Sequence, residues 1–224
     1  MSARLLATLV CVLNSVLCFG QAAPVDPPEH RVLVYLSNDS GQSSQILDRM
    51  KREVGSLMEP AGYSVLWQVS DGSSASVSEV KVVIMELRGV CRPLATVMPF
   101  ATVVNGASLA SSVVEDGQVL PFTRLDCAML SNFLAPYLPH QTDQRNLLFG
   151  QAMGRLAAHE LFHTLTKTKI HEDIGVAKES FSAANLLGER FSFDFPAIIK
   201  FRDSAPARTA EMSDAEEDHV SVGR

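Results

Sequence analysis

The chain contains little of what marks several protein classes. Only four of its 224 residues are cysteine, too few for a small domain held together by disulfides, and its 13 glycines exclude a collagen-like chain. Lysine and arginine number 19 against 25 acidic residues, so the chain lacks the positive charge with which proteins bind nucleic acid. Beyond the N-terminal segment, no stretch approaches the ~18 apolar residues of a membrane-spanning helix. We therefore expect neither nucleic acid nor stable membrane insertion, while the oligomeric state stays open.

What is present suits one folded domain with appendages. Hydrophobic residues make up 46% of the sequence and charged residues 20%, which is enough apolar material for a sizeable core and too much for a wholly disordered chain. We expect the domain to span residues 31–201. Residues 203–224 hold six acidic side chains and few apolar ones, so we predict a disordered acidic tail there.

The N-terminal segment resembles a targeting signal. Arg4 is the single charge within residues 1–22, an apolar run extends from Leu5 to Leu17, and small residues follow at Ala22 and Ala23. A short basic region, an apolar region and a small-x-small site indicate a secretory signal peptide. We predict a signal peptide over 1–22 and export to a periplasm or the cell exterior. The alternative is an uncleaved N-terminal anchor.

Export changes what the cysteines can do. Cys11 and Cys18 leave with the signal peptide, so Cys91 and Cys127 remain in an oxidising compartment. We predict one disulfide between them, and two buried free thiols are the alternative. Neither residue has the CxxC spacing of a metal ligand.

Hydrophobic patterning predicts a mixed succession of elements. Strands are expected over 31–36, 64–69 and 80–87, with a helix over 46–58 that Gly62 ends. A further strand is expected over 94–102. Asp116-Gly117 lies between alternating segments at 110–115 and 118–125, a strong hairpin signal.

The second half is expected to be mainly helical. The expected elements are a short helix over 128–138, a long helix over 144–165 capped by Thr142 or Asp143, a helix over 176–187, and irregular phenylalanine-rich chain to Phe201. The whole order predicts an α+β fold with an α/β-like beginning, in which helices pack on a twisted mixed sheet.

A metal-binding pattern lies on the long helix. Residues 159–163 read His-Glu-Leu-Phe-His, and two histidines four apart on a helix share one face. Their imidazoles can converge on Zn²⁺, while Glu160 is placed to take a proton from a zinc-activated water as general base. A buried helix would otherwise enclose three costly polar groups. The alternative is a surface helix that carries these residues by accident.

A catalytic zinc usually takes three protein ligands and a water. His171 is the leading third candidate because it lies eight residues after His163, and Thr166, Thr168 and Ile170 disfavour a longer helix. The rival candidates are carboxylates at Glu172, Asp173, Glu179 and Glu189, of which Glu189 is expected on a following helix. The other histidines, His30, His140 and His219, are expected on the surface in loops or tails, although His140 precedes the long helix.

The motif resembles that of the zincin superfamily of zinc metallopeptidases, and the preceding element order is similar to the upper half of a metzincin-like catalytic domain. The string from Gly154 to Lys178 is also similar to a group of exported, largely uncharacterised bacterial proteins with a predicted zincin domain. This resemblance implies that His159, His163 and His171 bind one zinc per chain and that Glu160 is the catalytic base.

The spacing departs from the metzincin pattern HExxHxxGxxH. Thr166 stands where that pattern has glycine and Lys169 where it has its third histidine, so the sequence reads HExxHxxxxxxxH. No methionine lies between His171 and Phe201, so the usual Met-turn is absent. The sequence thus indicates a zincin with a loop geometry of its own.

Two functions follow as hypotheses. The first is a secreted zinc peptidase, an endopeptidase rather than an exopeptidase, whose polypeptide substrate pairs with a hairpin strand beside the active helix. The second is a zinc-binding module without proteolytic activity. The intact Glu160 favours the peptidase, because a degenerate site is expected to lose its base. No tyrosine, histidine or arginine presents itself as the oxyanion stabiliser.

Overall fold

The computed structural model describes residues 30–37, 42–69, 80–94 and 108–205. Several expected features lie wholly or mainly outside these ranges: the signal peptide over 1–22, the strand over 94–102 and the acidic tail over 203–224. In the described part of the chain, no helix has the length and apolar character needed to cross a membrane.

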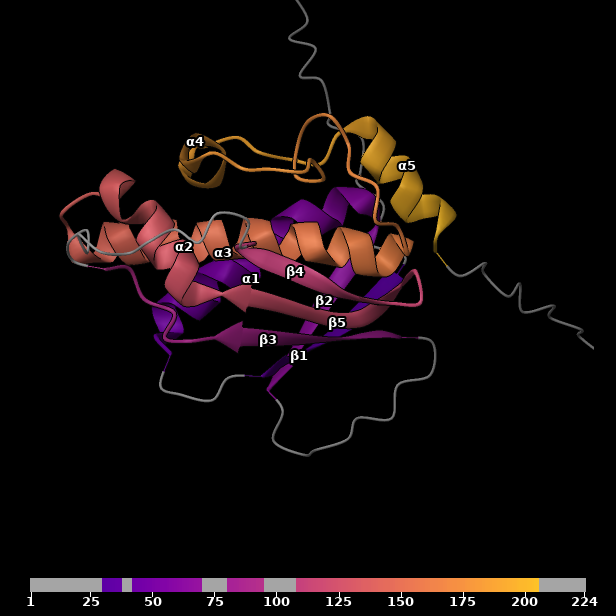
Figure 1. The fold of residues 1–224 in the computed structure, drawn as a ribbon, viewed down its shortest axis with the longest axis horizontal. Helices are drawn as coiled ribbons and strands as arrows, with labels where there is room; N and C mark the ends of the chain where they lie inside the picture. Colours follow the sequence, from indigo (N-terminus) through magenta and orange to yellow (C-terminus); the bar gives the residue numbers. More distant parts are fainter. Residues whose placement is uncertain (1–29, 38–41, 70–79, 95–107, 206–224) are drawn as a thin grey trace, which may run out of the picture.

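A five-stranded mixed sheet forms one layer of the described structure (Figure 1). Its strands lie in the order β2-β1-β3-β5-β4, parallel except for β4, which runs antiparallel to β5. Their bounds are β1 His30–Ser37, β2 Tyr63–Val69, β3 Lys81–Arg88, β4 Ala110–Glu115 and β5 Gln118–Asp126. The predicted hairpin is therefore present, and β3 lies at the centre of the sheet.

The hairpin turn follows from its two central residues. Asp116 and Gly117 both have positive φ, 48° and 80°, which a two-residue turn of this twist requires and which Asp-Gly accepts at little cost. This turn places β4 at the edge of the sheet, and among the described strands β4 pairs with β5 alone.

Helices cover one face of the sheet (Figure 1). On β3, Val83, Met85 and Leu87 are buried against this layer, whereas Val82 and Ile84 on the opposite face are exposed. The helices and short 3-10 turns are α1 Ser44–Met58, η1 Glu59–Ala61, α2 Cys127–Leu134, η2 Ala135–Tyr137, α3 Thr142–Thr166, α4 Ala183–Leu187 and α5 Phe195–Asp203. The predicted fold, an α+β arrangement of helices on a mixed sheet with HExxH on a long helix, is confirmed.

The long helix α3 packs very closely on α1. A Cβ atom at Gly150 would lie 2.6 Å from the carbonyl oxygen of Ile46, and one at Gly154 would lie 2.6 Å from Glu53 Cβ and 2.8 Å from the carbonyl oxygen of Met50. Side-chain carbon at either position would collide with the other helix. The two glycines thus set the depth at which α3, and everything it carries, lies in the core.

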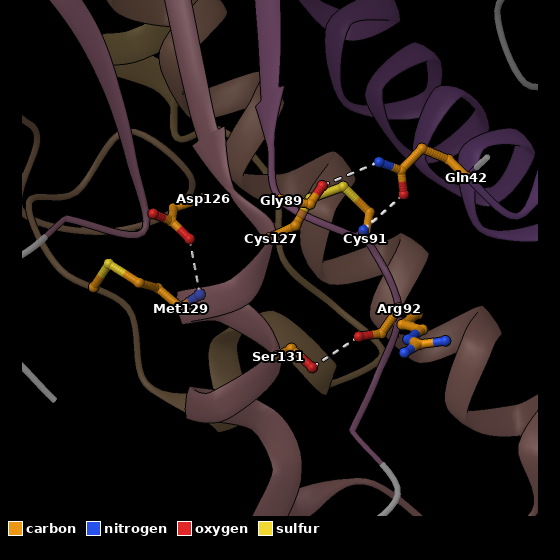
Figure 2. The surroundings of a disulfide bond; sticks show 8 residues. All are labelled: Gln42, Gly89, Cys91, Arg92, Asp126, Cys127, Met129 and Ser131. Carbon is orange, nitrogen blue, oxygen red and sulfur yellow. Dashed lines mark hydrogen bonds between the residues drawn. A yellow bond between two sulfur atoms is a disulfide. The ribbon is translucent and has the colours of Figure 1, made fainter. Parts of the chain in front are cut away.

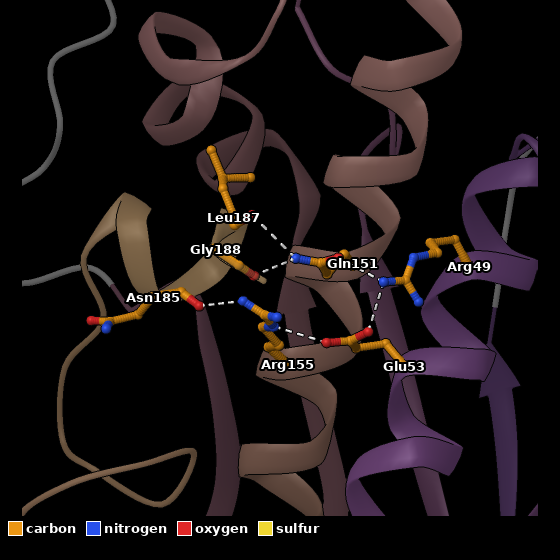
Figure 3. Close-up of polar contacts among 7 residues, drawn as sticks. All are labelled: Arg49, Glu53, Gln151, Arg155, Asn185, Leu187 and Gly188. Carbon is orange, nitrogen blue, oxygen red and sulfur yellow. Dashed lines mark hydrogen bonds and ion pairs between the residues drawn. The ribbon is translucent and has the colours of Figure 1, made fainter. Parts of the chain in front are cut away.

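A buried ion pair fixes the same interface (Figure 3). Arg155, on α3, is almost wholly buried; its Nε donates to Glu53 Oε1 at 2.8 Å and its Nη1 to the carbonyl oxygen of Asn185 at 2.5 Å. Arg49 approaches the second oxygen of Glu53 at 2.9 Å, and Gln151 donates to the carbonyl oxygens of Leu187 and Gly188. These contacts join α1, α3 and α4 into one unit.

The predicted disulfide is present (Figure 2). Cys91, after β3, is bonded to Cys127 at the start of α2, across 36 positions of sequence. Gln42 holds the same corner, because its side chain donates to the carbonyl oxygen of Gly89 at 3.1 Å and accepts from the backbone N–H of Cys91 at 2.6 Å. The disulfide therefore ties the end of a central strand to the chain that leads into α3.

Three element predictions need correction. The long helix begins at Thr142 and its N-cap is Gln141, so Thr142 and Asp143 lie inside its first turn and neither caps it. The helix predicted over 176–187 is reduced to α4, because the backbone of Val176 is engaged elsewhere: its N–H donates to the carbonyl oxygen of Ser192. The chain before Phe201 is not irregular throughout, since Asp194 caps α5 by accepting from the backbone N–H of Ala197.

Candidate metal centre

The motif residues lie deep in the structure on the second half of α3. His159, Glu160 and His163 are 6%, 3% and 6% exposed. The apolar neighbours of these residues on the helix, such as Leu161 and Phe162, are buried as well. A helix surrounded by core on nearly all sides explains why three polar groups are held away from water here.

The end of α3 brings the chain back toward its own histidines. The helix stops at Thr166, and Lys167 takes a left-handed conformation with φ 54°, which reverses the chain direction although lysine has a Cβ that disfavours it. The end of the helix therefore lies one residue beyond the predicted Leu165. The following segment returns over the helix and carries His171 to the two motif histidines.

Three imidazoles meet at this point. One possible ligand atom from each of His159, His163 and His171 lies within 4.8 Å of the others. The ring of His171 stacks on that of His159, with centroids 5.3 Å apart, and meets that of His163 edge-on at 4.7 Å. No other group of three histidine, cysteine or acidic side chains in the described residues has this arrangement.

Backbone carbonyls fix the orientation of two of these rings. His159 Nδ1 lies 2.7 Å from the carbonyl oxygen of Val176, and His163 Nδ1 lies 2.8 Å from that of Thr168. A carbonyl oxygen can only accept, so each Nδ1 carries a proton and donates it. In a neutral imidazole the other nitrogen, Nε2, then has a free lone pair.

The two Nε2 atoms face each other 3.1 Å apart. Burial is the main cause that lowers the pKa of His159 to about 3, and the charge of the neighbouring His163 lowers it further. Burial also lowers the pKa of His163. Both rings are therefore neutral near pH 7, and two lone pairs point at one another with no proton between them. Such an arrangement is unfavourable unless a cation lies against both atoms.

The donor set fits zinc. Two nitrogens bound tetrahedrally at ~2.0–2.1 Å would be roughly 3.3 Å apart, close to the separation of the two Nε2 atoms. Three histidines would supply the three protein ligands that a catalytic zinc usually takes. The carbonyl partners of His159 and His163 are also the kind of outer contact that orients histidine ligands in metal sites.

Glu160 has a different environment from its neighbours. Its Oε2 accepts a hydrogen bond from the Ser112 hydroxyl of β4 at 2.7 Å. Burial raises the pKa of Glu160 to about 7, partly opposed by the hydrogen bond from Ser112. A carboxyl with a pKa near neutrality can both accept and return a proton, as a general base must.

The returning loop is anchored by the residues that follow His171. Glu172 forms an ion pair with Lys200 on α5, and its backbone N–H donates to the carbonyl oxygen of Ala177. Phe181 packs edge-on against His159, with ring centroids 5.1 Å apart. Gly175 has φ 73°, and a Cβ there would lie 2.5 Å from the carbonyl oxygen of Ser192. The loop is thus held by packing from α5 and the following chain.

The other proposed ligands do not join the three histidines. Glu172 is paired with Lys200, and Asp173, Glu179 and Glu189 are exposed. Glu189 lies after the end of α4 rather than on a helix. His140 is exposed before α3, and His30 lies in β1 beside Tyr63, so its expected place in a loop was wrong. His219 is outside the described residues.

Sequence reasoning missed several residues of this site. The carbonyl partners of the histidines, at Thr168 and Val176, have no side-chain signal, because backbone groups of any residue can fill that role. Ser112 lies 48 positions before Glu160, to which it donates, and Phe181 lies 22 positions after His159, against which it packs. The predicted hairpin strand beside the active helix was the signal that pointed toward Ser112.

Comparison with known proteins gives a structural likeness. No protein family matches the sequence, and no curated protein matches it significantly. Among solved structures, the chain is similar to archaemetzincin from Methanopyrus kandleri, with a TM-score of 0.47 and 14% sequence identity over 78% of this chain and 95% of that one. Likeness at this level concerns the course of the backbone, so the chemistry of the site is taken from its own residues.

Proposed function

We propose that this chain is an exported zinc-dependent peptidase of the zincin type. His159, His163 and His171 hold the metal, one ion per chain, and Glu160 is the general base. The observation that carries the proposal is the approach of the His159 and His163 Nε2 atoms to 3.1 Å, with the third histidine beside them. Neutral imidazoles whose nitrogens converge in this way are suited to bind a zinc ion together.

Zinc, when bound at such a site, supplies a Lewis acid that activates water and polarises a carbonyl group. The protein itself orients the ligands, excludes water and transfers the proton. The carbonyls of Val176 and Thr168 keep the histidine rings oriented, and the apolar surroundings of α3 keep bulk water away. Glu160 takes the proton of the attacking water and delivers it to the departing amine, so its carboxyl ends the cycle as it began.

A polypeptide is the substrate that the edge strand favours. β4 has a free edge among the described strands, and Ser112 on this strand touches Glu160. An extended peptide that hydrogen-bonds to this edge passes beside the base, which is the geometry of strand addition. An edge open along β4 suits cleavage within a chain, so we propose an endopeptidase.

Metal analysis and two substitutions test the assignment. The mature protein should bind one zinc and cleave a denatured protein or a mixed peptide library, and a chelator should abolish the cleavage. Glu160→Gln should keep the metal and lose hydrolysis, because glutamine preserves the shape but cannot accept the proton. Glu59→Gln, an exposed glutamate on η1, is the matched control and should keep both.

The third ligand has its own comparison. His171→Ala should weaken zinc affinity by orders of magnitude, whereas Glu189→Ala should leave it near the wild-type value, both measured by competition with a chromogenic chelator. Retention of zinc in His171→Ala with its loss in Glu189→Ala would move the site to two histidines and a glutamate. Zinc binding without cleavage of any peptide would favour the non-proteolytic module instead.

A further inference from the structure

Ser112 connects the edge strand to the proposed base. It lies in β4, opposite Thr123 of β5, and the register of the two strands shifts between Ser112 and Val114. Such irregularities bend a strand and redirect its side chains. Here the side chain of Ser112 reaches the helix: its Oγ lies 2.7 Å from Glu160 Oε2, 3.3 Å from the Glu160 carbonyl oxygen and 3.4 Å from Thr164 Oγ1.

The direction of these hydrogen bonds can be assigned. Thr164 donates its only hydroxyl proton to the carbonyl oxygen of Glu160 at 2.9 Å. Ser112 also has one proton, and its shortest contact is with the carboxylate oxygen, which as an ionised group is the stronger acceptor. Ser112 therefore donates to Oε2. Among the described residues, Ser112 is the one side chain that donates to this carboxylate, so the contact restrains its rotation.

We propose that Ser112 is a positioning residue for Glu160. By holding Oε2, it leaves the second carboxylate oxygen to accept the proton of the water that Glu160 must deprotonate. Because Ser112 belongs to the strand on which the substrate is proposed to lie, the same strand aligns the peptide and the base. This inference rests on the proposed function, and Ser112 itself touches neither the metal ligands nor the reacting bond.

Three variants separate positioning from simple packing. Ser112→Ala removes the hydroxyl and should lower kcat by about 10- to 100-fold, an effect of the size seen when a contact that orients a site residue is lost, with KM little changed. Ser112→Thr keeps a hydroxyl in a residue suited to a strand, so it should restore most of kcat. Thr123→Val is the matched control: its buried hydroxyl has no hydrogen-bond partner in the described structure, so kcat should stay at the wild-type value.

A second measurement does not depend on activity. In metal-free protein, the melting temperatures of wild type, Ser112→Ala, Glu160→Ala and the double variant form a double-mutant cycle. If the two side chains interact, the effects are not additive. Zinc affinity, measured by chelator competition, should be unchanged in Ser112→Ala, because the histidines keep their carbonyl partners.

Each result decides the matter. Additive melting temperatures would show that the contact does not exist and would overturn the inference. Coupling with unchanged kcat in Ser112→Ala would overturn the positioning role, as would a loss of kcat that Ser112→Thr fails to restore. A wild-type protein that binds zinc but cleaves no peptide would overturn the proposed function and the catalytic part of this inference together, and the cycle would still report on the contact.

Discussion

Gly154→Ala should destabilise the protein and weaken zinc binding at the proposed metal site, although alanine is the better helix former. Gly154 lies in the interior of α3, where replacing glycine by alanine would contribute about 1 kcal/mol of stability in open space. Space is not open here, because the added Cβ would lie 2.6 Å from Glu53 Cβ and 2.8 Å from the carbonyl oxygen of Met50. Neither atom is the end of a flexible side chain, so the two helices must separate.

The magnitude follows from the balance of these effects. Forcing a methyl group into a packed core costs typically ~1–3 kcal/mol and sometimes more. The separation also strains the buried pair of Arg155 and Glu53, whose atoms are 2.8 Å apart, and a damaged buried pair is costly. We expect a net loss of about 2 kcal/mol, with a shift of His159 that weakens zinc binding.

Urea unfolding of the mature protein, with chelator competition for zinc affinity, measures both effects. Gly55→Ala is the matched control: Gly55 lies in α1, and an added Cβ there would meet nothing within 4 Å. This variant should gain up to ~1 kcal/mol and keep the wild-type zinc affinity. If Gly154→Ala were as stable as Gly55→Ala and bound zinc as tightly, the close approach of α1 and α3 would not be real.

Three further predictions concern stability. Replacing both Cys91 and Cys127 by serine should cost about 3–4 kcal/mol in the chain-entropy treatment of a loop of 36 residues, measured by urea unfolding; free thiols in the native, unreduced protein would contradict the disulfide. Lys167→Gly should raise stability by ~1 kcal/mol, because glycine accepts the left-handed conformation at the end of α3, and a lower melting temperature would refute this. In the metal-free protein, the Glu160 carboxyl loses its proton near pH 4.5 when unfolded and near 7 when folded, so it costs stability as pH rises through this window, up to about 3 kcal/mol. Glu160→Gln should therefore melt higher than wild type at pH 8 and equally at pH 4, and an equal difference at both would contradict the cause assigned.

Local signals predicted the first half of the fold well. The Asp116-Gly117 turn was predictable because both residues accept positive φ. Gly62, which also has positive φ, likewise marked where the helical chain after α1 ends. The sheet order was not readable, because the pairing of β1 with both β2 and β3 depends on contacts far apart in sequence. The pattern of apolar residues in the sequence indicates where the strands are but not which strands pair.

The second half shows where tertiary contacts override local preference. The segment from Val176 to Ser182 has helix-compatible residues. The carbonyl oxygen of Val176, however, accepts a hydrogen bond from His159 Nδ1, and its N–H donates to the carbonyl oxygen of Ser192. A backbone engaged in this way cannot form helical hydrogen bonds. α5 is a different case, since Asp194 followed by Pro196 is an ordinary helix start, and that signal was present in the sequence.

The meeting of three histidines was predictable only in part. The spacing of His159 and His163 fixes a shared helix face, but the approach of His171 depends on the left-handed Lys167 and on the anchoring of Glu172 by Lys200. Lysine at such a position gives no sequence signal, whereas glycine would. The orientation of the rings, which points to a cation, depends on backbone carbonyls and is invisible before the structure.

The disulfide has a consequence for a protein that is proposed to cut other proteins. Cys91 and Cys127 enclose the chain that contains β4 and β5, the strands nearest the proposed base. A single backbone cut between Arg92 and Asp126, whether by another molecule of the same protein or by a foreign protease, would leave the two pieces covalently joined. A nicked molecule would therefore migrate as one chain without reductant and as two with it, and its α3 would stay attached to the rest of the sheet.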